Sequence, residues 1–206
     1  MSSKGSSIFP TTWATLRQSL KGCSMSSIDE LRTLVIQDAV KIGTFTLASG
    51  RVSDLYVDMR KVTLNPKGAF LIGSIITEMI SGREVDAVGG MSLGADPIAV
   101  ATSIVAFQSG RHVVSFLVRK AQKDHGTRNL IEGPIAPGMK AVIVEDVITT
   151  GASTIAAIER VRDAGMSIDM VVAIFDRCEG GKEAIESLGI EVRSILSRKD
   201  ILSSTP

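Results

Sequence analysis

The chain has 206 residues, and its 23 basic and 22 acidic residues leave a formal net charge of +1. This length is typical of one domain with a sizeable core, and the near-neutral charge argues against non-specific binding to nucleic acid or to a membrane. Cys23 and Cys178 are far apart without a Cys/His cluster, and no apolar run approaches the roughly 20 residues of a membrane span, so the sequence predicts no disulfide framework, zinc site or membrane helix.

The first 28 residues contain three basic residues, Lys4, Arg17 and Lys21, but no acidic residue. They are rich in serine and threonine, a composition that resembles an organelle-targeting segment. A disordered tail or an upstream start codon explains the same composition, since Met25 opens MSSIDELRTL, a sensible N-terminus. We expect a disordered extension over residues 1–26 and a single domain over 27–206.

A helix is predicted at the start of this domain. Ser27 and Glu30 match a capping box, and a helical stripe of apolar residues runs from Leu31 up to Gly43. Period-two stretches around a Ser-Gly turn in TFTLASGRVSDLYVDMR then indicate two short strands or a hairpin. These elements predict a small antiparallel unit ahead of the main fold.

From Asn65 onward, helices alternate with strands. Asn65 and Pro66 suit the first turn of a helix that continues through GAFLIGSIITEMI. The later elements predicted from the pattern are VDAVGG, ADPIAVATSIVAF, HVVSFLV, KAVIVED, ASTIAAIERVRDAG, MVVAIFD, GGKEAIESLG and EVRSIL. Strands that alternate with helices of about 10 to 15 residues indicate an α/β fold, with a mostly parallel sheet flanked by helices.

Residues 119–139, RKAQKDHGTRNLIEGPIAPGM, interrupt this alternation. They lie between two apolar strands, yet they have little apolar content and carry Arg119, Lys120, Lys123, His125 and Arg128. A loop of this length inside a compact domain is usually functional or disordered. We expect a mobile functional loop.

The stretch AVIVEDVITTGAS, residues 141–153, predicts a phosphate site. Ligands of open α/β sheets lie beyond the carboxyl ends of the strands, and Glu145 and Asp146 are expected to end such a strand. The following turn leads into a helix, whose N–H groups and dipole favour an anion, and Gly151 allows the backbone to approach closely. A sugar phosphate suits both the two carboxylates and the turn, because its hydroxyls would donate to the carboxylates while its phosphate lies on the turn. The carboxylates could also stabilise positive charge at the anomeric carbon.

These residues resemble the signature of the type I phosphoribosyltransferases, which bind phosphoribosyl pyrophosphate. GTFTLASGRVSDLYVD, VRKAQKDHG and FDR at 175–177 narrow the resemblance to the orotate phosphoribosyltransferases, over about residues 27–200. The resemblance implies the type I phosphoribosyltransferase fold, with a hood over about 27–64 and a core over about 65–200. It also implies a homodimer in which the loop 119–139 of one subunit reaches the site of the other. A cytoplasmic location is expected because the two isolated cysteines suit a reducing compartment.

The activity that the resemblance implies is transfer of a ribosyl 5-phosphate group from phosphoribosyl pyrophosphate to orotate. The products are orotidine 5′-monophosphate, a precursor of UMP in pyrimidine biosynthesis, and pyrophosphate. Mg²⁺ is the implied cofactor, bound mainly through pyrophosphate and ribose oxygens of the substrate rather than by a protein ligand set.

The resemblance assigns catalytic roles to Lys123, His125 and Asp146. Substrate contacts are assigned to Arg119, Lys120, Lys123, His125, Glu145, Asp146, Val147, Ile148, Thr149, Thr150, Gly151, Ala152, Ser153 and Arg177. Thr149 and Arg177 would contact orotate, and the guanidinium fork of Arg177 matches a carboxylate. The cations at the start of the loop would neutralise the departing pyrophosphate, and closure of the loop would exclude water.

The sequence departs from the family pattern in two places. Ala48 stands where many members have a lysine, and GGMSLGADP at 89–97 lacks a Tyr-Lys pair that some members carry, so Ser92 and Gly94 are expected to offer backbone contacts instead. Tyr56 is expected near the orotate ring.

Two other functions stay open. One is a purine or uracil phosphoribosyltransferase, against which FDR and RKAQKDHG argue. The other is a regulator that senses phosphoribosyl pyrophosphate without catalysis. Such a regulator usually needs a nucleic-acid-binding module, for which the N-terminal stretch is too short and too weakly basic.

Overall fold

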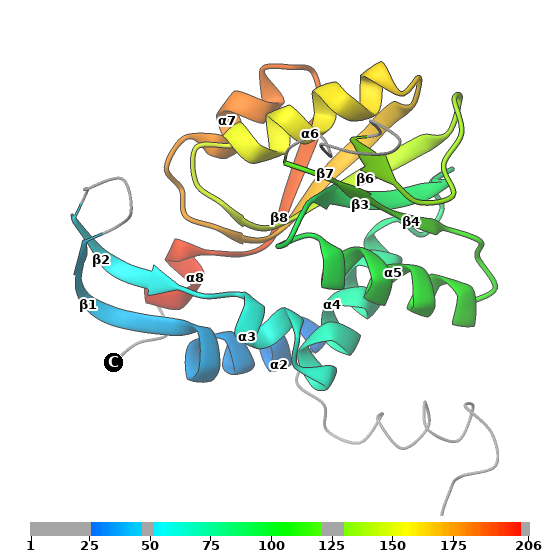
Figure 1. Cartoon of the computed structure of the whole chain (residues 1–206). Helices are drawn as coiled ribbons and strands as arrows, with labels where there is room; N and C mark the ends of the chain where they lie inside the picture. The colour runs from blue at the N-terminus through cyan, green and yellow to red at the C-terminus, as the bar shows by residue number, and fades with distance from the viewer. Residues whose placement is uncertain (1–25, 47–51, 121–129, 203–206) are drawn as a thin grey trace, which may run out of the picture.

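A computed structural model of the chain describes residues 26–46, 52–120 and 130–202 (Figure 1). The predictions made for residues 1–25, for Ala48 and for the loop residues Lys123 and His125 lie outside the described residues. Within the described part of the chain, no helix is long and apolar enough to cross a membrane.

The N-terminal unit consists of a helix, a π-helical turn and a hairpin. Their bounds are α2 (Ser27–Leu34), η1 (Val35–Ala39), β1 (Val40–Thr46) and β2 (Val52–Val57), and the two strands pair antiparallel. The predicted hairpin is therefore present. Figure 1 shows it extending away from the rest of the molecule.

Two details of the predicted helix were wrong. The N-cap is Ser26, whose Oγ accepts a hydrogen bond from the N–H of Asp29 at 3.2 Å, so the cap lies one residue before the predicted Ser27. The helix also ends before Gly43, because strand β1 already begins at Val40, which pairs with Val57. A β-branched valine suits this pairing better than a continued helix, and the strand partner decides between the two structures.

The core contains a six-stranded sheet with the order β5-β4-β3-β6-β7-β8. The strands are β3 (Ala87–Met91), β4 (Val114–Val118), β5 (Ile131–Glu132), β6 (Lys140–Ile148), β7 (Ser167–Asp176) and β8 (Glu191–Ser197). All neighbours pair parallel except β5, which is antiparallel to β4. The predicted α/β class with a mostly parallel sheet is confirmed.

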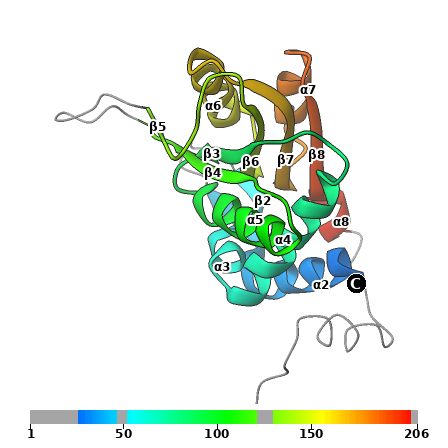
Figure 2. The ribbon, with the colours of Figure 1, turned by 90° about the vertical axis from the view of Figure 1, so that its right-hand side faces the viewer.

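Helices cover both faces of this sheet (Figure 2). The helices that follow the hairpin are α3 (Arg60–Thr63), α4 (Pro66–Met79), α5 (Asp96–Gln108), α6 (Ala152–Asp163), α7 (Gly181–Glu186) and α8 (Arg198–Leu202). Helices α6 and α7 lie on one face, whereas α4 and α5 lie on the other. As predicted, α4 begins after Asn65, whose side chain accepts hydrogen bonds from the N–H groups of Lys67 and Gly68.

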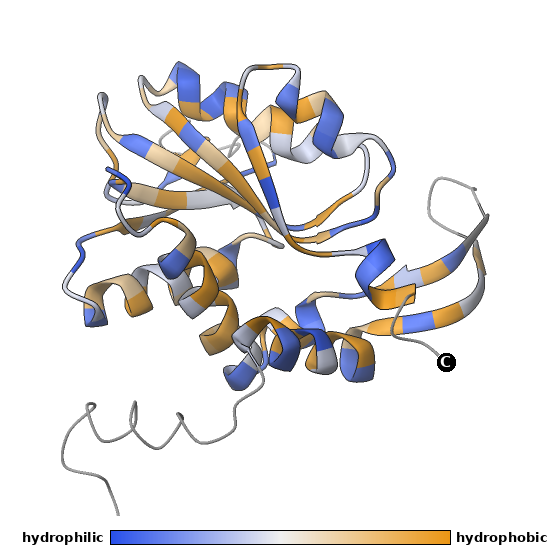
Figure 3. Cartoon of the chain, turned by 180° about the vertical axis from the view of Figure 1, so that it is seen from behind, coloured by the Kyte–Doolittle hydropathy of each residue, from blue (hydrophilic) through white to orange (hydrophobic). Residues whose placement is uncertain are grey.

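Two buried apolar clusters hold the sheet between its helices. Successive side chains of a strand point to opposite faces, so Val142 and Val144 of β6 join one cluster while Ala141 and Ile143 join the other. Burial on both sides explains why the sequence reads AVIV without alternation. In Figure 3, α4 and α5 carry more hydrophobic colour than α6 and α7.

Two arginines connect the N-terminal hairpin to the core. An Nη of Arg177, just after β7, donates to the carbonyl of Leu55 in β2 at 3.3 Å. Arg198 in α8 donates to both carboxylate oxygens of Asp54 at 2.6 Å. The hairpin is therefore held over the same end of the sheet at which β7 and β8 finish.

Candidate functional site

The order of the strands reverses between β3 and β6. From β3 the chain passes through α5 to β4 on one side, whereas β6 continues to β7 and β8 on the other side. Such a reversal leaves a crevice at the carboxyl ends of the two central strands, which is where open α/β sheets bind ligands. The candidate site therefore lies between the turn at 92–95, after β3, and the turn at 149–151, after β6.

Contact between Gly94 and Asp146 joins the two sides of this crevice. A Cβ at Gly94 would lie only 2.5 Å from Oδ1 of Asp146, so no side chain fits at position 94 without moving the carboxylate. Asp146 is half-buried, and its Oδ1 accepts a hydrogen bond from the N–H of Val147 at 2.8 Å. The turn at 92–95 therefore meets the acidic pair, and a side chain at position 94 would displace the carboxylate of Asp146.

Glu145 is buried beneath the start of α6. Its Oε2 accepts hydrogen bonds from the hydroxyls of Ser153 and Thr154 at 2.8 and 2.9 Å. Burial raises the pKa of Glu145 to about 7, and the neighbouring Asp146 adds to this shift, while the two hydroxyls oppose it. Glu145 thus anchors the helix that follows the turn, which is one reason for an acid to stand beside an anion site.

The sequence predicted that Glu145 and Asp146 end their strand, and this prediction was wrong. Strand β6 continues through Val147 to Ile148, which pairs with Asp176 of β7. This pairing keeps the turn in register with the end of β7. Both acids therefore lie within the sheet, where their backbone is fixed by neighbours on β7.

The turn at 149–151 exposes the N-terminal end of α6. Gly151 is the N-cap of this helix, has a φ of 80°, and supplies no side-chain cap to the first N–H groups. These groups are oriented toward the crevice and suit an anion. A left-handed φ favours glycine at this position, as the sequence indicated.

Gly181, at the start of α7, supports the turn from behind. A Cβ at this position would lie 2.6 Å from the carbonyl oxygen of Thr149 and 2.7 Å from the nitrogen of Gly151. Sequence reasoning assigned GGKEAIESLG only to a helix and missed this role. The paired glycines Gly180 and Gly181 were the available signal.

Arg177 lies at the end of β7, beside the turn. Its side chain is buried, with Nε donating to Glu179 at 2.8 Å and an Nη donating to Leu55, and its backbone N–H donates to Ile148. The structure therefore places this guanidinium between the hairpin and the ends of β6 and β7. Glu179, which orients Arg177, was not identified from the sequence.

The loop 119–139, which we name the cationic loop, starts at the end of β4. The backbone N–H of Arg119 donates to the carbonyl of Leu130 at 2.8 Å, and its guanidinium pairs with Glu132 at 3.3 Å. Lys120 is exposed. The predicted loop 119–139 is shorter than expected at its far end, because β5 pairs with β4 and because Ile135 and Met139 pack against an apolar cluster.

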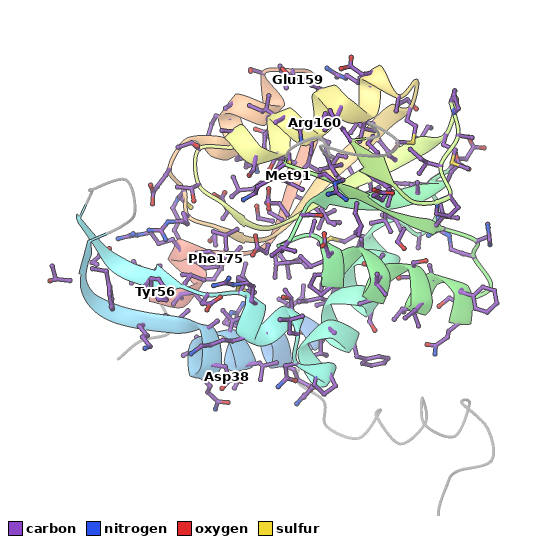
Figure 4. The ribbon with its side chains drawn as sticks, viewed as in Figure 1. Asp38, Tyr56, Met91, Glu159, Arg160 and Phe175 are labelled. Atoms are coloured by element: carbon purple, nitrogen blue, oxygen red, sulfur yellow. The ribbon has the colours of Figure 1, made fainter. Side chains whose placement is uncertain are left out.

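The hairpin and the segment that leads into α3 contribute further aromatic and polar groups. Tyr56 packs against Phe45 with ring centroids 5.7 Å apart, and its location near orotate stays a prediction (Figure 4). Arg60 donates to Asp58 at 2.9 Å, and this carboxylate, followed by Tyr56 and Asp146, raises the pKa of Arg60. Arg60 thus lies within electrostatic reach of Asp146, which no sequence pattern had indicated.

A protein-built metal centre is absent from the part of the chain that the structure describes. There, no group of three or more His, Cys, Asp and Glu side chains could hold a metal ion. The acidic pair nevertheless supplies hard oxygen donors of the type that Mg²⁺ prefers, alongside ligand oxygens.

Comparison with known proteins places this crevice in a family. No protein-family model matches the chain. A curated orotate phosphoribosyltransferase of Rhodopirellula baltica is 44% identical over 178 residues, which cover 82% of this chain and 91% of that protein. The chain belongs to the orotate phosphoribosyltransferase family.

Solved structures of orotate phosphoribosyltransferases share the fold. A crystal structure of the Mycobacterium tuberculosis enzyme in complex with Fe(III) dicitrate is 40% identical, with a TM-score of 0.76, and the match covers 85% of this chain and 98% of that chain. Another crystal structure of that enzyme, in complex with phosphoribosyl pyrophosphate, is 34% identical with a TM-score of 0.72, and covers 87% and 93%. The resemblance and the fold predicted from the sequence are both confirmed.

Proposed function

We propose that the protein is an orotate phosphoribosyltransferase of pyrimidine biosynthesis. It transfers the ribosyl 5-phosphate group of phosphoribosyl pyrophosphate to orotate and releases orotidine 5′-monophosphate and pyrophosphate. The observation that carries this proposal is the pairing of a helix N-terminus with two carboxylates at the strand-order reversal, in a chain whose curated relatives have this activity.

The 5-phosphate of the substrate would lie on the turn at 149–151. There the N-terminal N–H groups of α6 donate to it, and Gly151 leaves room for close approach. Residues 145–153 would surround the ribose and phosphate, with the hydroxyls of the ribose donating to the acidic pair. A solved complex of a relative with phosphoribosyl pyrophosphate supports the choice of this ligand.

The chemical step breaks the bond between the anomeric carbon and a pyrophosphate oxygen. A ring nitrogen of orotate bonds to that carbon and loses its proton, which the released pyrophosphate accepts. Positive charge grows on the ribosyl group during this exchange, and the carboxylate of Asp146 would stabilise it. Arg119, Lys120, Lys123 and His125 would neutralise the negative charge that accumulates on the departing pyrophosphate. Their action is strongest in the transition state, where it raises kcat.

Orotate would be recognised at the end of β7. Arg177 is buried beside the turn, and a guanidinium matches a carboxylate in two hydrogen bonds. Thr149 would contact the same ligand from the other side. The contact of Arg177 with Leu55 supports a site that is closed by the hairpin.

Mg²⁺ would enter with the substrate. The fit of the described residues favours this route, because they offer an acidic pair but no larger ligand cluster. Asp146, the less buried of the two acids, would approach a metal that is held mainly by ribose and pyrophosphate oxygens. The ion, when bound, supplies positive charge beside the leaving group.

A homodimer is proposed from the outer face of α5. Val100, Ile104 and Phe107 are exposed by 46, 54 and 72%, and their spacing places them in one stripe of the helix. Leu93, in the turn that leads into α5, is 75% exposed. An apolar patch of this kind marks a protein interface, and a second copy seated here would lie beside the active site, within reach of a shared loop. The cytoplasmic location also remains a prediction.

An assay with several acceptors tests the activity. The protein is incubated with phosphoribosyl pyrophosphate and Mg²⁺ together with orotate, uracil, adenine or hypoxanthine, and release of pyrophosphate is measured. We expect release with orotate only. A signal only with another base would establish the alternative transferase, and binding of phosphoribosyl pyrophosphate without any release would favour the regulator.

A further inference from the structure

Arg160 on α6 contacts the first two residues of the cationic loop, Arg119 and Lys120. Its guanidinium donates to the carbonyl oxygen of Arg119 through one Nη and to that of Lys120, at 3.1 Å, through the other. The first Nη also lies 3.7 Å from the sulfur of Met91. Figure 4 labels Arg160 and Met91, which come from α6 and from the end of β3.

These contacts join three segments of the proposed active site. Helix α6 begins at the phosphate turn, Met91 ends β3 just before the turn at 92–95, and Arg119 and Lys120 follow β4 at the start of the loop. The N–H of Ser92 donates to the carbonyl of Val118 at 2.9 Å, so the ends of β3 and β4 are already tied together. Arg160 adds α6 to this connection.

The chemistry of arginine suits this task. Its planar guanidinium carries donors in a fixed fork, so one side chain can hold two successive carbonyls in a defined geometry. The half-buried position of Arg160 limits competition from water. Arg119 is held from the opposite side, by Leu130 through its N–H and by Glu132 through its side chain.

We propose that Arg160 is a positioning residue that sets where the cationic loop leaves β4 relative to the phosphate turn. It touches no substrate atom, and it acts through the backbone of Arg119 and Lys120, whose side chains are proposed to meet the pyrophosphate. This inference rests on the proposed function for its catalytic consequence. Residue 160 lies outside the motif at 145–153, so the sequence pattern assigned it no role.

The kinetic test compares Arg160→Gln and Arg160→Lys with Arg162→Gln, a control on the exposed side of the same helix. We expect Arg160→Gln to lower kcat/KM for phosphoribosyl pyrophosphate about tenfold, since small misplacements of catalytic groups carry large costs in rate. The KM for orotate should stay within about twofold of wild type, because Arg177 is untouched. The kcat/KM of Arg160→Lys should lie between those of wild type and Arg160→Gln, since an ammonium group cannot hold both carbonyls as the planar guanidinium does.

Amide hydrogen exchange provides a readout that needs no activity. In Arg160→Gln, exchange at the N–H of Arg119 should rise at least about fivefold, while the rest of the sheet keeps its protection. Arg162→Gln should match wild type in both measurements. Hydrogen exchange still tests whether Arg160 holds the backbone of Arg119 and Lys120 if wild type shows no transferase activity. That lack of activity would count against the proposed function alone.

Three results would overturn the inference. Unchanged hydrogen exchange at the N–H of Arg119 in Arg160→Gln would show that Arg160 does not hold the start of the cationic loop. Raised exchange with wild-type kinetics would show that the contact has no positioning role. A KM for orotate that rises as far as the KM for phosphoribosyl pyrophosphate, together with a melting temperature several degrees lower, would show a general structural role.

Discussion

Glu145 illustrates, at the scale of single residues, how an acid can contribute to an anion site without facing the anion. Its carboxylate holds the hydroxyls of Ser153 and Thr154 and thereby fixes the first turn of α6. Asp146, which is less buried and lies against Gly94, is left on the crevice side. The two acids thus differ in burial and in hydrogen-bond partners, although their carboxylates lie close enough to interact.

The raised pKa of Glu145 predicts a pH dependence of stability. Its pKa rises from 4.5 unfolded to about 7 folded, so the folded protein retains a proton that the unfolded chain loses between these values. This stabilising contribution is complete below about pH 4.5 and is lost as the pH rises through about 7. Glu145→Gln cannot titrate, so its free energy of unfolding relative to wild type should increase from pH 5 to pH 8, by up to about 3 kcal/mol.

Urea unfolding at pH 5, 6.5 and 8 measures this difference. Glu183→Gln, at an exposed position of α7, is the control and should show the same offset from wild type at each pH. An offset for Glu145→Gln that also stays constant would mean that Glu145 is ionised throughout this range.

Arg177→Ala tests recognition of orotate. Loss of a charged hydrogen-bond partner is worth about 1.5 to 3 kcal/mol, so the KM for orotate should rise by roughly 10- to 100-fold, with the KM for phosphoribosyl pyrophosphate nearly unchanged. Steady-state kinetics with each substrate varied in turn gives both values. The double variant Arg177→Ala/Glu179→Gln avoids leaving the carboxylate of Glu179 without this partner, and should show the same selectivity. An equal effect on both substrates would remove Arg177 from the orotate site.

At the scale of elements, α7 controls the phosphate turn although it contributes no ligand. A methyl group at Gly181 would meet backbone atoms of the turn, which cannot move aside as the end of a side chain could. Gly181→Ala should therefore displace the turn, raise the KM for phosphoribosyl pyrophosphate at least about tenfold and destabilise the fold by about 1 to 3 kcal/mol. Kinetics and thermal unfolding test this, with Glu183→Ala on the same helix as control. A variant with unchanged KM would show that the turn tolerates the shift.

At the scale of the whole molecule, the apolar face of α5 predicts the assembly. Ile104→Glu places a charge in the proposed interface and should convert a dimer to a monomer, because a buried unpaired charge is costly. Ile42→Glu is a matched control, since Ile42 on the hairpin is exposed by 55% and Ile104 by 54%. Light scattering measures the mass of each variant. A dimer that persists in Ile104→Glu would place the interface elsewhere.

A shared active site predicts that two inactive variants restore activity when they form mixed dimers. Lys123→Ala removes a proposed loop cation and Asp146→Asn removes the charge of the acidic pair, so each variant alone should be nearly inactive. When the two are unfolded and refolded together in equal amounts, about half of the dimers are mixed, and each mixed dimer holds one intact site. Activity should recover to roughly a quarter of wild type. No recovery would show that the loop serves its own subunit.

Much of the fold was readable from the sequence because its signals are local. The buried run AVIV, the cap at Asn65 and the glycine of the phosphate turn each reflect the conformation of a few adjacent residues. The site motif was readable for the same reason, since residues 145–153 are contiguous and form both the acidic pair and the turn.

Features that depend on residues far apart in the chain could not be predicted from the sequence. The end of the helical segment at Ala39, the last residue of η1, depends on the pairing of Val40 with Val57. The need for glycine at Gly181 depends on a turn 30 residues earlier in the sequence. The contact of Arg160 with the carbonyl of Lys120 spans 40 residues and involves a backbone atom that every residue possesses. Periodicity and motifs record the local conformation of a chain, whereas close packing and contacts to backbone carbonyls arise only when the strands take their order in the sheet.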